Sequence, residues 1–445
     1  MNSNTGLHFY INVRNFNDVV EDEEKQGGVN HSIHALDTLF SSTEQYGMTN
    51  YPDTFVVEKI TGSRLHMYVT GKIDRAFETA ASIILYSVKV SELMSSDIAK
   101  YKSLKPFVLQ AGAAYGKFYE HEFYMDDYEE MTTIGYACNY AAKLQGLAGA
   151  SSIAVSENIY NTMSLEEKSV FIKRHNSIIH KYKQTCYYEA LMSRMISRIE
   201  LSDTQVKSIR GYANKRNLTD MSFSEVRQSL NMERLSVTNG RRIEGIPVFA
   251  DVRDFTSEFL PDDSNLKEMA QKTKQILEKL HAITVNQGGV HVQFQGDREF
   301  ALYHNVGNQK CYKDAVLGAM RMIDAVKPYS VHIGVGEAFG RMYAVRIGAR
   351  GEKDRLLIGR TVNKADYLED NLALKDQLVI SKDVYDGLKQ QDNELARQFR
   401  RIGEDIYVTT IGFDAYKNQK TYAKQEHETK NRQYNGAYGA FNERR

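Results

Sequence analysis

Near its middle the chain reads Val248-Phe-Ala-Asp-Val-Arg-Asp-Phe-Thr256. The segment begins with the apolar, β-prone residues of a buried strand, yet Asp251 interrupts them and polar residues follow. Further along, Val290-His-Val-Gln-Phe-Gln-Gly-Asp-Arg-Glu-Phe-Ala-Leu-Tyr303 indicates two short strands joined by a tight turn at Gly296-Asp297. Apolar residues recur at helical spacing between the two segments, over residues 266–280. The predicted order is strand, helix, hairpin.

This order predicts that two acidic side chains meet. In a split βαβ sheet of the ferredoxin type, the first strand lies beside the third, so its end meets the turn between strands two and three. We therefore expect Asp251 and Asp297 to converge at one edge of one sheet. Two carboxylates so close repel each other unless cations neutralise them, and oxygen ligands suit Mg²⁺ or Mn²⁺. The alternative is a strand-end Asp and an ordinary Gly-Asp turn with no shared function.

The composition excludes several classes of protein. The chain has 445 residues, enough for about three average domains or for two larger ones with a connector. Its 57 basic residues balance 57 acidic ones, so no net field attracts nucleic acid or an anionic membrane. Three unpatterned cysteines favour a reducing compartment over a disulfide scaffold or a zinc site. No membrane-spanning run, leader or lipidation signal is present, so we expect a cytoplasmic protein without membrane insertion.

The amino-terminal part of the chain repeats the central pattern without its acids. Asn12 takes the place of Asp251 in a matching strand, and Ser63 takes the place of Asp297 in a matching hairpin. Two further matches follow in the same order, Gly112-Ala-Ala-Tyr-Gly-Lys-Phe-Tyr119 with Gly336-Glu-Ala-Phe-Gly-Arg-Met-Tyr343 and Gly135-Tyr-Ala-Cys-Asn-Tyr-Ala141 with Gly359-Arg-Thr-Val-Asn-Lys-Ala365. Collinear matches of this kind indicate a tandem duplication.

The duplication predicts an α+β fold with two tandem ferredoxin-like (βαββαβ) lobes. We expect a first lobe without metal carboxylates over residues 1–192 and a polar, partly helical connector over 193–242, with helical spacing in Ser222–Leu230. The second lobe, over residues 243–413, carries the carboxylates. Residues 414–445 are rich in polar residues and Gly and poor in aliphatic ones, which predicts a flexible tail.

These motifs resemble those of the class III nucleotide cyclases. The first strand of that family reads Phe-x-Asp-Ile-x-Gly-Phe-Thr, matched from Phe249 to Thr256 except that Asp254 replaces Gly. Its metal hairpin carries Gly-Asp, and a later helix opens Gly-x-x-x-Asn-x-Ala-x-Arg, matched from Gly135 and from Gly359 up to the last residue. The resemblance covers nearly all of both halves and implies an intramolecular head-to-tail pseudo-dimer.

The resemblance also implies a division of labour. In the second lobe, Asp251, Asp297 and the main-chain carbonyl of Val252 would hold two divalent cations, Mg²⁺ or Mn²⁺. The first lobe would supply a base-reading pair, a ribose-orienting residue and a phosphate-binding cation, namely Lys59 and Thr132, Asn139, and Lys143. Lys143 replaces the family's arginine, which keeps the charge but loses the bidentate fork.

Each of these assignments has a simpler alternative. Lys59 could be a solvated strand lysine, Lys143 an ordinary helix-face lysine, and Asn139 a helix cap.

Lys181 or Lys183 could add a second cation to the phosphate site. The reciprocal pocket lacks both carboxylates and the cation, so we expect it to be inactive; it would combine Asn12, Ser63, Gln293, Leu356, Asn363 and Tyr367.

The predicted activity converts a ribonucleoside triphosphate into a 3′,5′-cyclic nucleotide and pyrophosphate by two-metal catalysis. Lys59 and Thr132 suit adenine and do not exclude a pyrimidine. A chain with no attached sensor domain resembles the pyrimidine cyclases of Pycsar antiphage systems, so we expect CTP first and UTP next, with a separate effector protein for the product. We expect a monomer or a weak dimer and no binding of nucleic acid duplexes.

Three alternatives to a pyrimidine cyclase stay open. The first is an adenylate cyclase that converts ATP to cyclic AMP. The second is a catalytically inactive protein that binds a nucleotide to regulate a partner. The third is a diguanylate cyclase, because Gly296-Asp-Arg-Glu-Phe300 resembles the Gly-Gly-Asp-Glu-Phe turn of that family. We rank the third low because that family lacks the Gly-x-x-x-Asn-x-Ala helix start.

Overall fold

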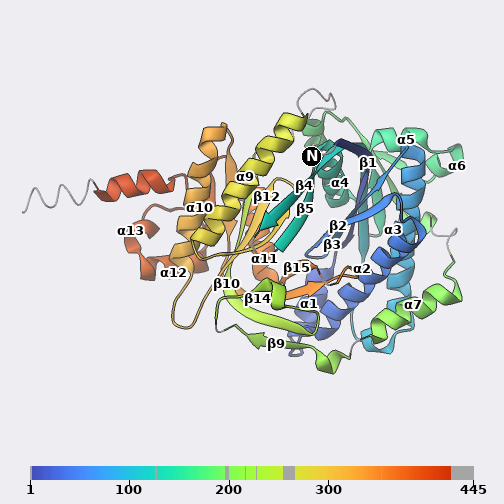
Figure 1. The fold of residues 1–445 in the computed structure, drawn as a ribbon, viewed down its shortest axis with the longest axis horizontal. Coiled ribbons are helices and arrows are strands. Elements are labelled where there is room, and N and C mark those ends of the chain that lie inside the picture. The colour runs from blue at the N-terminus through green and yellow to red at the C-terminus, as the bar shows by residue number, and fades with distance from the viewer. Residues whose placement is uncertain are drawn as a thin grey trace, which may run out of the picture.

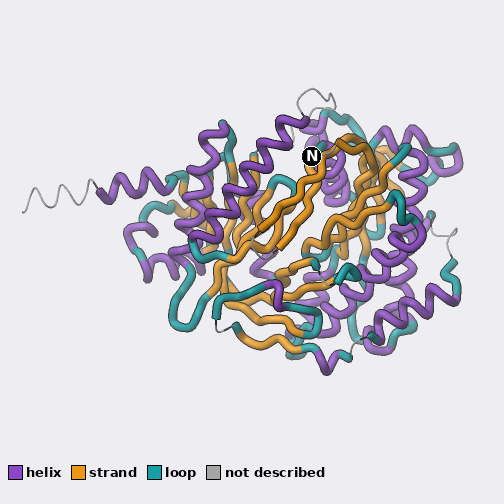
Figure 2. Tube along the Cα trace, viewed as in Figure 1, coloured by secondary structure: helices purple, strands orange, loops and turns teal. Residues whose placement is uncertain are grey.

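The structure is a computed structural model that describes residues 3–125, 128–195, 200–215, 217–226, 228–253, 266–351 and 353–421. Strands of two β-sheets lie at its centre and most helices lie outside them (Figure 1, Figure 2). Among the residues within these ranges, no helix combines the length and the apolar character that crossing a bilayer requires.

The first lobe is built on one mixed sheet. Its strands are β1 (Ser3–Val13), β2 (Phe55–Thr61), β3 (Arg64–Thr70), β4 (Leu109–Met125), β5 (Tyr128–Ile134), β6 (Ser152–Val155), β7 (Ile172–Arg174) and β8 (Tyr187–Leu191). Their order is β2-β3-β1-β4-β6-β8-β7, with β5 paired to β4. Its helices are α1 (Phe16–Glu24), α2 (Asn30–Asn50), α3 (Ile73–Ser96), α4 (Tyr136–Leu147), α5 (Glu157–Thr162) and α6 (Leu165–Lys168), with 3₁₀ turns η1 (Ala99–Tyr101), η2 (Ser177–Tyr182) and η3 (Met192–Arg194).

The second lobe repeats this plan. Its strands are β10 (Asn239–Val252), β11 (Val290–Gln295), β12 (Arg298–His304), β13 (Ile333–Glu337), β14 (Gly340–Ile347), β15 (Asp354–Ile358), β16 (Gln377–Ser381), β17 (Arg400–Gly403) and β18 (Ile406–Thr409). Their order is β11-β12-β10-β13-β16-β18-β17, while β14 pairs with β10 and β15. Its helices are α9 (Leu266–Asn286), α10 (Tyr312–Val326), α11 (Arg360–Tyr367), α12 (Lys382–Gln391) and α13 (Asn393–Ala396), with the 3₁₀ turn η8 (Lys327–Tyr329) and the π-helix η9 (Leu368–Leu372).

The two sheets share one register, which confirms the predicted pair of tandem lobes. In the first sheet Asn12 of β1 lies opposite Arg64 of β3. In the second sheet Asp251 of β10 lies opposite Arg298 of β12. The central strands β1 and β10 are therefore hydrogen-bonded on both sides, and this explains why both are largely apolar. The end of each central strand meets the turn of its neighbouring hairpin.

The segment between the lobes contains helical turns and one strand that the sequence pattern did not predict. It contains α7 (Asp203–Asn214), η5 (Leu218–Asp220), β9 (Ser222–Glu225) and η6 (Met232–Arg234). The helical spacing expected over Ser222–Leu230 is wrong in its first half, because β9 pairs in parallel with the start of β10 and extends the second sheet. Tertiary pairing outweighs the local helical pattern at this point.

The start of the predicted tail is also ordered. Residues 413–421 are helical, and Tyr416 is buried in the core of the second lobe. The guanidinium of Arg321 lies 3.6 Å from the centre of the Phe413 ring. Two aromatic anchors thus fix a segment whose composition is otherwise polar, and the flexible tail expected from residue 414 is wrong up to residue 421. Residues 422–445 lie outside the described part of the chain.

Each lobe inserts a side chain into the core of the other. Ile134, at the end of β5 in the first lobe, is buried within the hydrophobic cluster of the second lobe. Ile358, at the end of β15 in the second lobe, is buried within the cluster of the first. These two residues hold equivalent positions in the duplicated pattern. The lobes therefore share their cores at both ends of their contact.

Polar bonds at the lobe junction follow the same symmetry. The Glu130 carboxylate of β5 accepts a hydrogen bond from the Phe294 amide of β11 at 2.8 Å. The Asp354 carboxylate of β15 accepts one from the Ile60 amide of β2 at 3.0 Å. His291 of the second lobe adds a further bridge on one side of the junction. Its Nε2 lies 3.0 Å from Glu130 of the first lobe, and its Nδ1 lies 2.9 Å from Glu299 of its own lobe. Although burial opposes it, the Glu299 and Glu130 carboxylates raise the pKa of His291 to about 9.

The exchange of core residues predicts that one truncation in either lobe destabilises the whole protein. We expect Ile134→Ala and Ile358→Ala each to lower the free energy of unfolding by about 2–4 kcal/mol, because each leaves a cavity in the opposite core. Ile172→Ala, at a residue that is half exposed, should change it by less than about 0.5 kcal/mol. Denaturant unfolding measured by circular dichroism checks this, and a truncation without cost would contradict it.

The His291 bridge predicts a loss of stability at alkaline pH. Its pKa is about 9 in the folded protein against 6.5 ordinarily, so its contribution is complete below about pH 6.5 and is lost as the pH rises through about 9. In His291→Gln this decline should be smaller than in the wild type. The exposed His180→Gln serves as the control. Burial also raises the pKa of Glu337 to about 8, so other groups change stability over the same pH range. The measurement is therefore the difference between the unfolding free energies of the variant and the wild type at each pH. A difference that does not change with pH would refute the bridge.

Candidate active site

Two acidic side chains meet at one edge of the second sheet, as the order of elements predicts. Asp251 is the penultimate residue of β10 and Val252 is the last. Because Asp251 lies opposite Arg298 in the register, Asp297 in the β11–β12 turn comes next to it. Gly296 makes this turn possible, since its φ of 69° lies in the left-handed region. Residues 254–256 of the sequence motif lie outside the described part of the chain.

The electrostatics of the two acids show that they are close. Burial raises the pKa of Asp297 well above its ordinary range, and the neighbouring Asp251 carboxylate raises it further. Burial also raises the pKa of Asp251, while the guanidinium groups of Arg298 and Arg253 oppose this effect. The side chain of Asp251 is 27% exposed and lies 3.5 Å from Arg253. The pair is thus partly open to solvent and only partly neutralised.

A lysine of the first lobe, Lys181, interacts with these acids. Lys181 belongs to η2, where partial burial lowers the pKa of its ammonium group and Lys143 of α4 lowers it further. The carboxylates of Asp251, Asp370 and Asp297 act in the other direction. Lys181 therefore interacts both with the acids of the second lobe and with Lys143 of its own lobe. Lys183 is exposed and ends η2 in a left-handed conformation.

Asn139 lies across the lobe junction from the acidic turn. A Cβ atom built on Gly296 would be 3.4 Å from the Asn139 Oδ1 atom, so this side chain faces the Gly296-Asp297 turn. Helix α4, which carries Asn139 and Lys143, begins directly after Gly135. A Cβ atom at Gly135 would lie only 2.7 Å from the Lys117 carbonyl oxygen, so only glycine allows the helix to start so close to β4. The sequence motif therefore fixes where the helix points.

Lys59 is buried and has two partners. Its ammonium group donates to the Glu130 carboxylate at 2.6 Å and to the Phe294 carbonyl oxygen at 2.7 Å. The lysine therefore spans the lobe junction instead of being a solvated strand residue. It also lines a cavity of about 200 Å³ between the lobes, together with Gln293, its counterpart in the duplication. The cavity thus lies on the approximate two-fold axis that relates the lobes.

Thr132 is fully buried and contacts Glu58, which lines the same cavity. Its hydroxyl donates to Glu58 at 3.3 Å, and the Thr133 amide donates to the same carboxylate oxygen at 3.0 Å. Burial opposes ionisation of Glu58, but His66 and Lys59 lower its pKa to about 2. The carboxylate is therefore charged, and it fixes the direction of the Thr132 hydroxyl.

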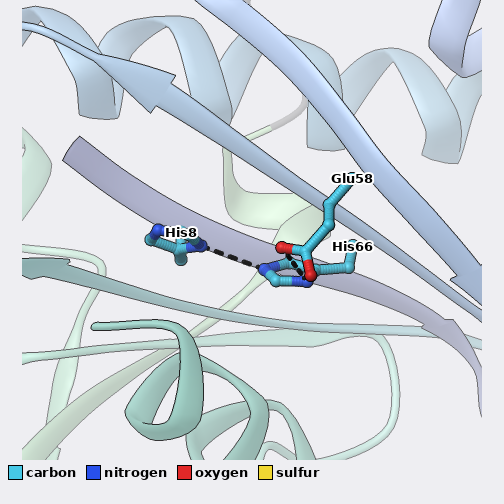
Figure 3. A group of neighbouring side chains, drawn as sticks. All are labelled: His8, Glu58 and His66. Carbon is cyan, nitrogen blue, oxygen red and sulfur yellow. Dashed lines mark hydrogen bonds and ion pairs between the residues drawn. The ribbon is translucent and has the colours of Figure 1, made fainter. Parts of the chain in front are cut away.

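A chain of polar contacts runs from Glu58 to His66 and from His66 to His8 (Figure 3). His66 Nδ1 lies 2.8 Å from the Glu58 carboxylate, and His66 Nε2 lies 3.0 Å from His8 Nδ1. Burial lowers the pKa of His8 well below its ordinary value, and His66 lowers it further, so His8 stays neutral. Glu58 and His8 bind opposite nitrogens of one imidazole, so the three groups do not converge on a common point. They form a hydrogen-bond relay and not a metal cage.

The reciprocal pocket has neutral side chains at the two positions where the first pocket has acids. The Ser63 hydroxyl donates to Asn12 Oδ1 at 2.9 Å, at the position of the two acids in the other lobe. Gln293 accepts from Thr61 at 3.3 Å and donates to the Arg355 carbonyl oxygen at 3.2 Å. Among the remaining members, Leu356 is fully buried, Asn363 is partly buried and Tyr367 is 54% exposed.

Sequence reasoning missed Glu58 and Glu130, the partners of Thr132 and Lys59. A signal was present, since Glu58-Lys59 lies within the apolar strand β2 and buried charges need partners. The identity of those partners was not accessible, because Glu130 and Phe294 are far away in the sequence. Asp370 was missed for a different reason: it belongs to a π-helix whose surface direction has no simple sequence period.

Comparison with known proteins agrees with the motifs. No protein-family model matches the chain. A uridylate cyclase from Pseudomonas aeruginosa is 22% identical over 393 residues, which cover 81% of this chain and 74% of the relative. The crystal structure of a class III adenylyl cyclase-like ATP-binding protein from the same organism matches with a TM-score of 0.71 and 17% identity, covering 94% of this chain and 90% of that one.

The structural match extends over both lobes and the junction between them. The sequence match extends over most of the same span. The chain therefore has the fold of a class III nucleotide cyclase with two tandem lobes, and the resemblance found in its motifs is confirmed.

Proposed function

We propose that this protein is a nucleotide cyclase that converts a pyrimidine ribonucleoside triphosphate into a 3′,5′-cyclic monophosphate and pyrophosphate. The observation that carries the proposal is the placement of two first-lobe residues: Asn139 faces the acidic turn, and Lys181, which lies near Lys143, interacts with both Asp251 and Asp297 of the second lobe. Anionic phosphates placed between these groups would meet cations from one lobe. The acids of the other lobe would hold metal ions.

The two acids fit a pair of divalent cations. Their donor atoms are all oxygens, burial and mutual repulsion raise the pKa of Asp297, and Mg²⁺ or Mn²⁺ would relieve that repulsion. Asp251, Asp297 and the main-chain carbonyl of Val252 would be the protein ligands. When bound, such ions supply Lewis-acid activation of the ribose 3′-hydroxyl and neutralise charge on the triphosphate.

The remaining residues position the substrate. In the reaction the 3′-oxygen forms a bond to the α-phosphorus and the bond to the bridging oxygen of pyrophosphate breaks. The hydroxyl proton passes to solvent. Asn139 would orient the ribose so that the 3′-oxygen is in line with that bond. Lys143 and Lys181 would stabilise the negative charge that develops on the α-phosphate. Lys143 would take the place of the family's arginine, with one ammonium group in place of a bidentate guanidinium.

Base selection would lie with Lys59 and Thr132. Lys59 uses two of its donors on Glu130 and Phe294, which leaves one N–H for a carbonyl or ring nitrogen of the base. The Thr132 hydroxyl donates to Glu58, so its oxygen would offer the base an acceptor. Cytosine and uracil both provide a matching edge. The resemblance to the Pycsar cyclases favours CTP, whereas the relative at 22% identity is a uridylate cyclase, so we propose both CTP and UTP as candidate substrates to be compared.

The product would act as a second messenger. By resemblance to the Pycsar systems, we propose that a separate effector protein reads the cyclic nucleotide during antiphage defence. The fused lobes supply both halves of the site, so a monomer would be sufficient for activity.

The first test is the reaction itself. Purified protein with Mn²⁺ and each of the four ribonucleoside triphosphates should give one cyclic monophosphate by mass spectrometry, from CTP or UTP. Asp251→Asn and Asp297→Asn should each lower product formation by more than about 100-fold and weaken Mn²⁺ binding measured by electron paramagnetic resonance. Ser63→Ala and Tyr367→Phe, in the reciprocal pocket, should do neither.

The outcomes of this test separate the alternatives. Product from ATP alone would identify an adenylate cyclase, and bound nucleotide without product would identify a regulator. Equal losses in both sets of variants would refute the single composite site.

The second test concerns the two lysines. Lys143→Ala and Lys181→Ala should each lower kcat by about 10²–10³-fold with little change in Mn²⁺ affinity, because they stabilise developing charge on the phosphate. Lys143→Arg should retain most of the activity. Lys183→Ala is the matched control on the same turn and should behave as the wild type. Steady-state kinetics check this, and a change in KM alone would contradict the assigned role.

A further inference from the structure

One buried carboxylate connects the two segments that carry the acidic pair. Glu369 belongs to η9 and is 1% exposed. Its Oε1 atom lies 2.5 Å from the Nη2 atom of Arg253, which follows the end of β10. Its Oε2 atom pairs with Arg298, the first residue after the β11–β12 turn. Each arginine is thus close in sequence to one acid of the pair, and both are held by the same glutamate.

Both arginines are firmly placed by further contacts. Arg253 also donates to the main-chain oxygen of Glu369 at 2.6 Å. Arg298 lies 2.5 Å from the Asp366 carboxylate, and its guanidinium stacks 4.2 Å from the centre of the Phe249 ring. The side chains of Arg253 and Arg298 are 15% and 13% exposed. They are therefore structural charges and not mobile surface arginines.

Two glycines of β13 allow this arrangement. A Cβ atom at Gly334 would lie 2.0 Å from the Arg253 Nη2 atom, and one at Gly336 would lie 2.5 Å from the Glu369 amide nitrogen. Any side chain at either position would push the arginine or η9 away from the sheet. The sequence thus keeps open the space in which the glutamate meets both arginines.

The first lobe provides an internal comparison. Gln145 follows Asn139 at the same spacing at which Glu369 follows Asn363. It packs in the same way, because a Cβ atom at Gly112 would lie 2.0 Å from the Gln145 amide nitrogen. The arginines are kept in this lobe as Arg14 and Arg64. The lobe without the acidic pair therefore has the neutral isostere of the glutamate.

We infer that Glu369 is a positioning residue that, through Arg253 and Arg298, holds Asp251 and Asp297 together and keeps the Arg253 guanidinium from occupying the place of the cation. The inference rests on the proposed role of the two acids in binding metal. Arg253 already lies 3.5 Å from the Asp251 carboxylate. Burial raises the pKa of Glu369, and the guanidinium groups of Arg298 and Arg253 oppose this shift and favour the carboxylate. Without that carboxylate, Arg298 would keep Asp366 as a partner, whereas Arg253 would turn to Asp251 and compete with a divalent ion.

The test is the affinity of the full-length protein for Mn²⁺ without nucleotide, followed by electron paramagnetic resonance of the free ion. Glu369→Gln should raise the dissociation constant by about 10–100-fold, the usual effect of removing a group that orients metal ligands. In the cyclase assay its loss should appear mainly in the Mn²⁺ concentration required, with kcat recovering at saturating Mn²⁺. Glu337→Gln, another buried glutamate on β13, should bind Mn²⁺ as the wild type does.

A second variant guards against misfolding of the first. Glu369→Gln combined with Arg253→Gln removes the excess positive charge along with the carboxylate, and it should recover part of the lost Mn²⁺ affinity in a double-mutant cycle. Unchanged Mn²⁺ affinity in Glu369→Gln overturns the inference, as does a wild type that binds no Mn²⁺. A wild type that binds Mn²⁺ without forming product would instead overturn the proposed function and leave this inference standing.

Discussion

The candidate site is organised around two carboxylates that repel each other at one edge of the second sheet. Asp251 and Asp297 are brought together by strand register, and partial burial removes the water that would otherwise screen them. Such a pair is unfavourable in isolation. Nearby cations offset this repulsion. Arg253 and Arg298 belong to the same lobe as the acids, and Lys181 comes from the other lobe.

The duplication has divided one site between two copies. The register is the same in both sheets, and the same arginines follow the equivalent positions. The chemistry differs at three carboxylates, since Asn12, Ser63 and Gln145 stand where the second lobe has Asp251, Asp297 and Glu369. The first lobe instead carries the charged network of Glu58, Lys59 and Glu130 on its side of the junction. The apolar contacts are unequal as well: Val345, Ile347, Leu356 and Ile358 of the second lobe join the core of the first, whereas Ile134 of the first lobe is buried in the core of the second.

Much of the fold could be predicted from the sequence because local patterns and the repeat agree. The convergence of Asp251 and Asp297 follows from the order of elements alone, and the placement of Asn139 opposite the turn follows from the family resemblance. The bonds of Lys59 could not be predicted, because Glu130 and Phe294 become its neighbours only after the lobes dock. The strand β9 and the helix over residues 413–421 were missed because their partners lie in other elements, and composition carries no information on such contacts.

The reciprocal insertion of Ile134 and Ile358 has a consequence for regulation. In an assembly whose halves merely touch, an external signal could switch the enzyme off by pulling them apart. Here separation would expose both hydrophobic interiors at once, so dissociation and unfolding become the same event. Any natural control of this protein must therefore act while the halves stay joined, through small shifts along their shared seam or through the supply of nucleotide and ions.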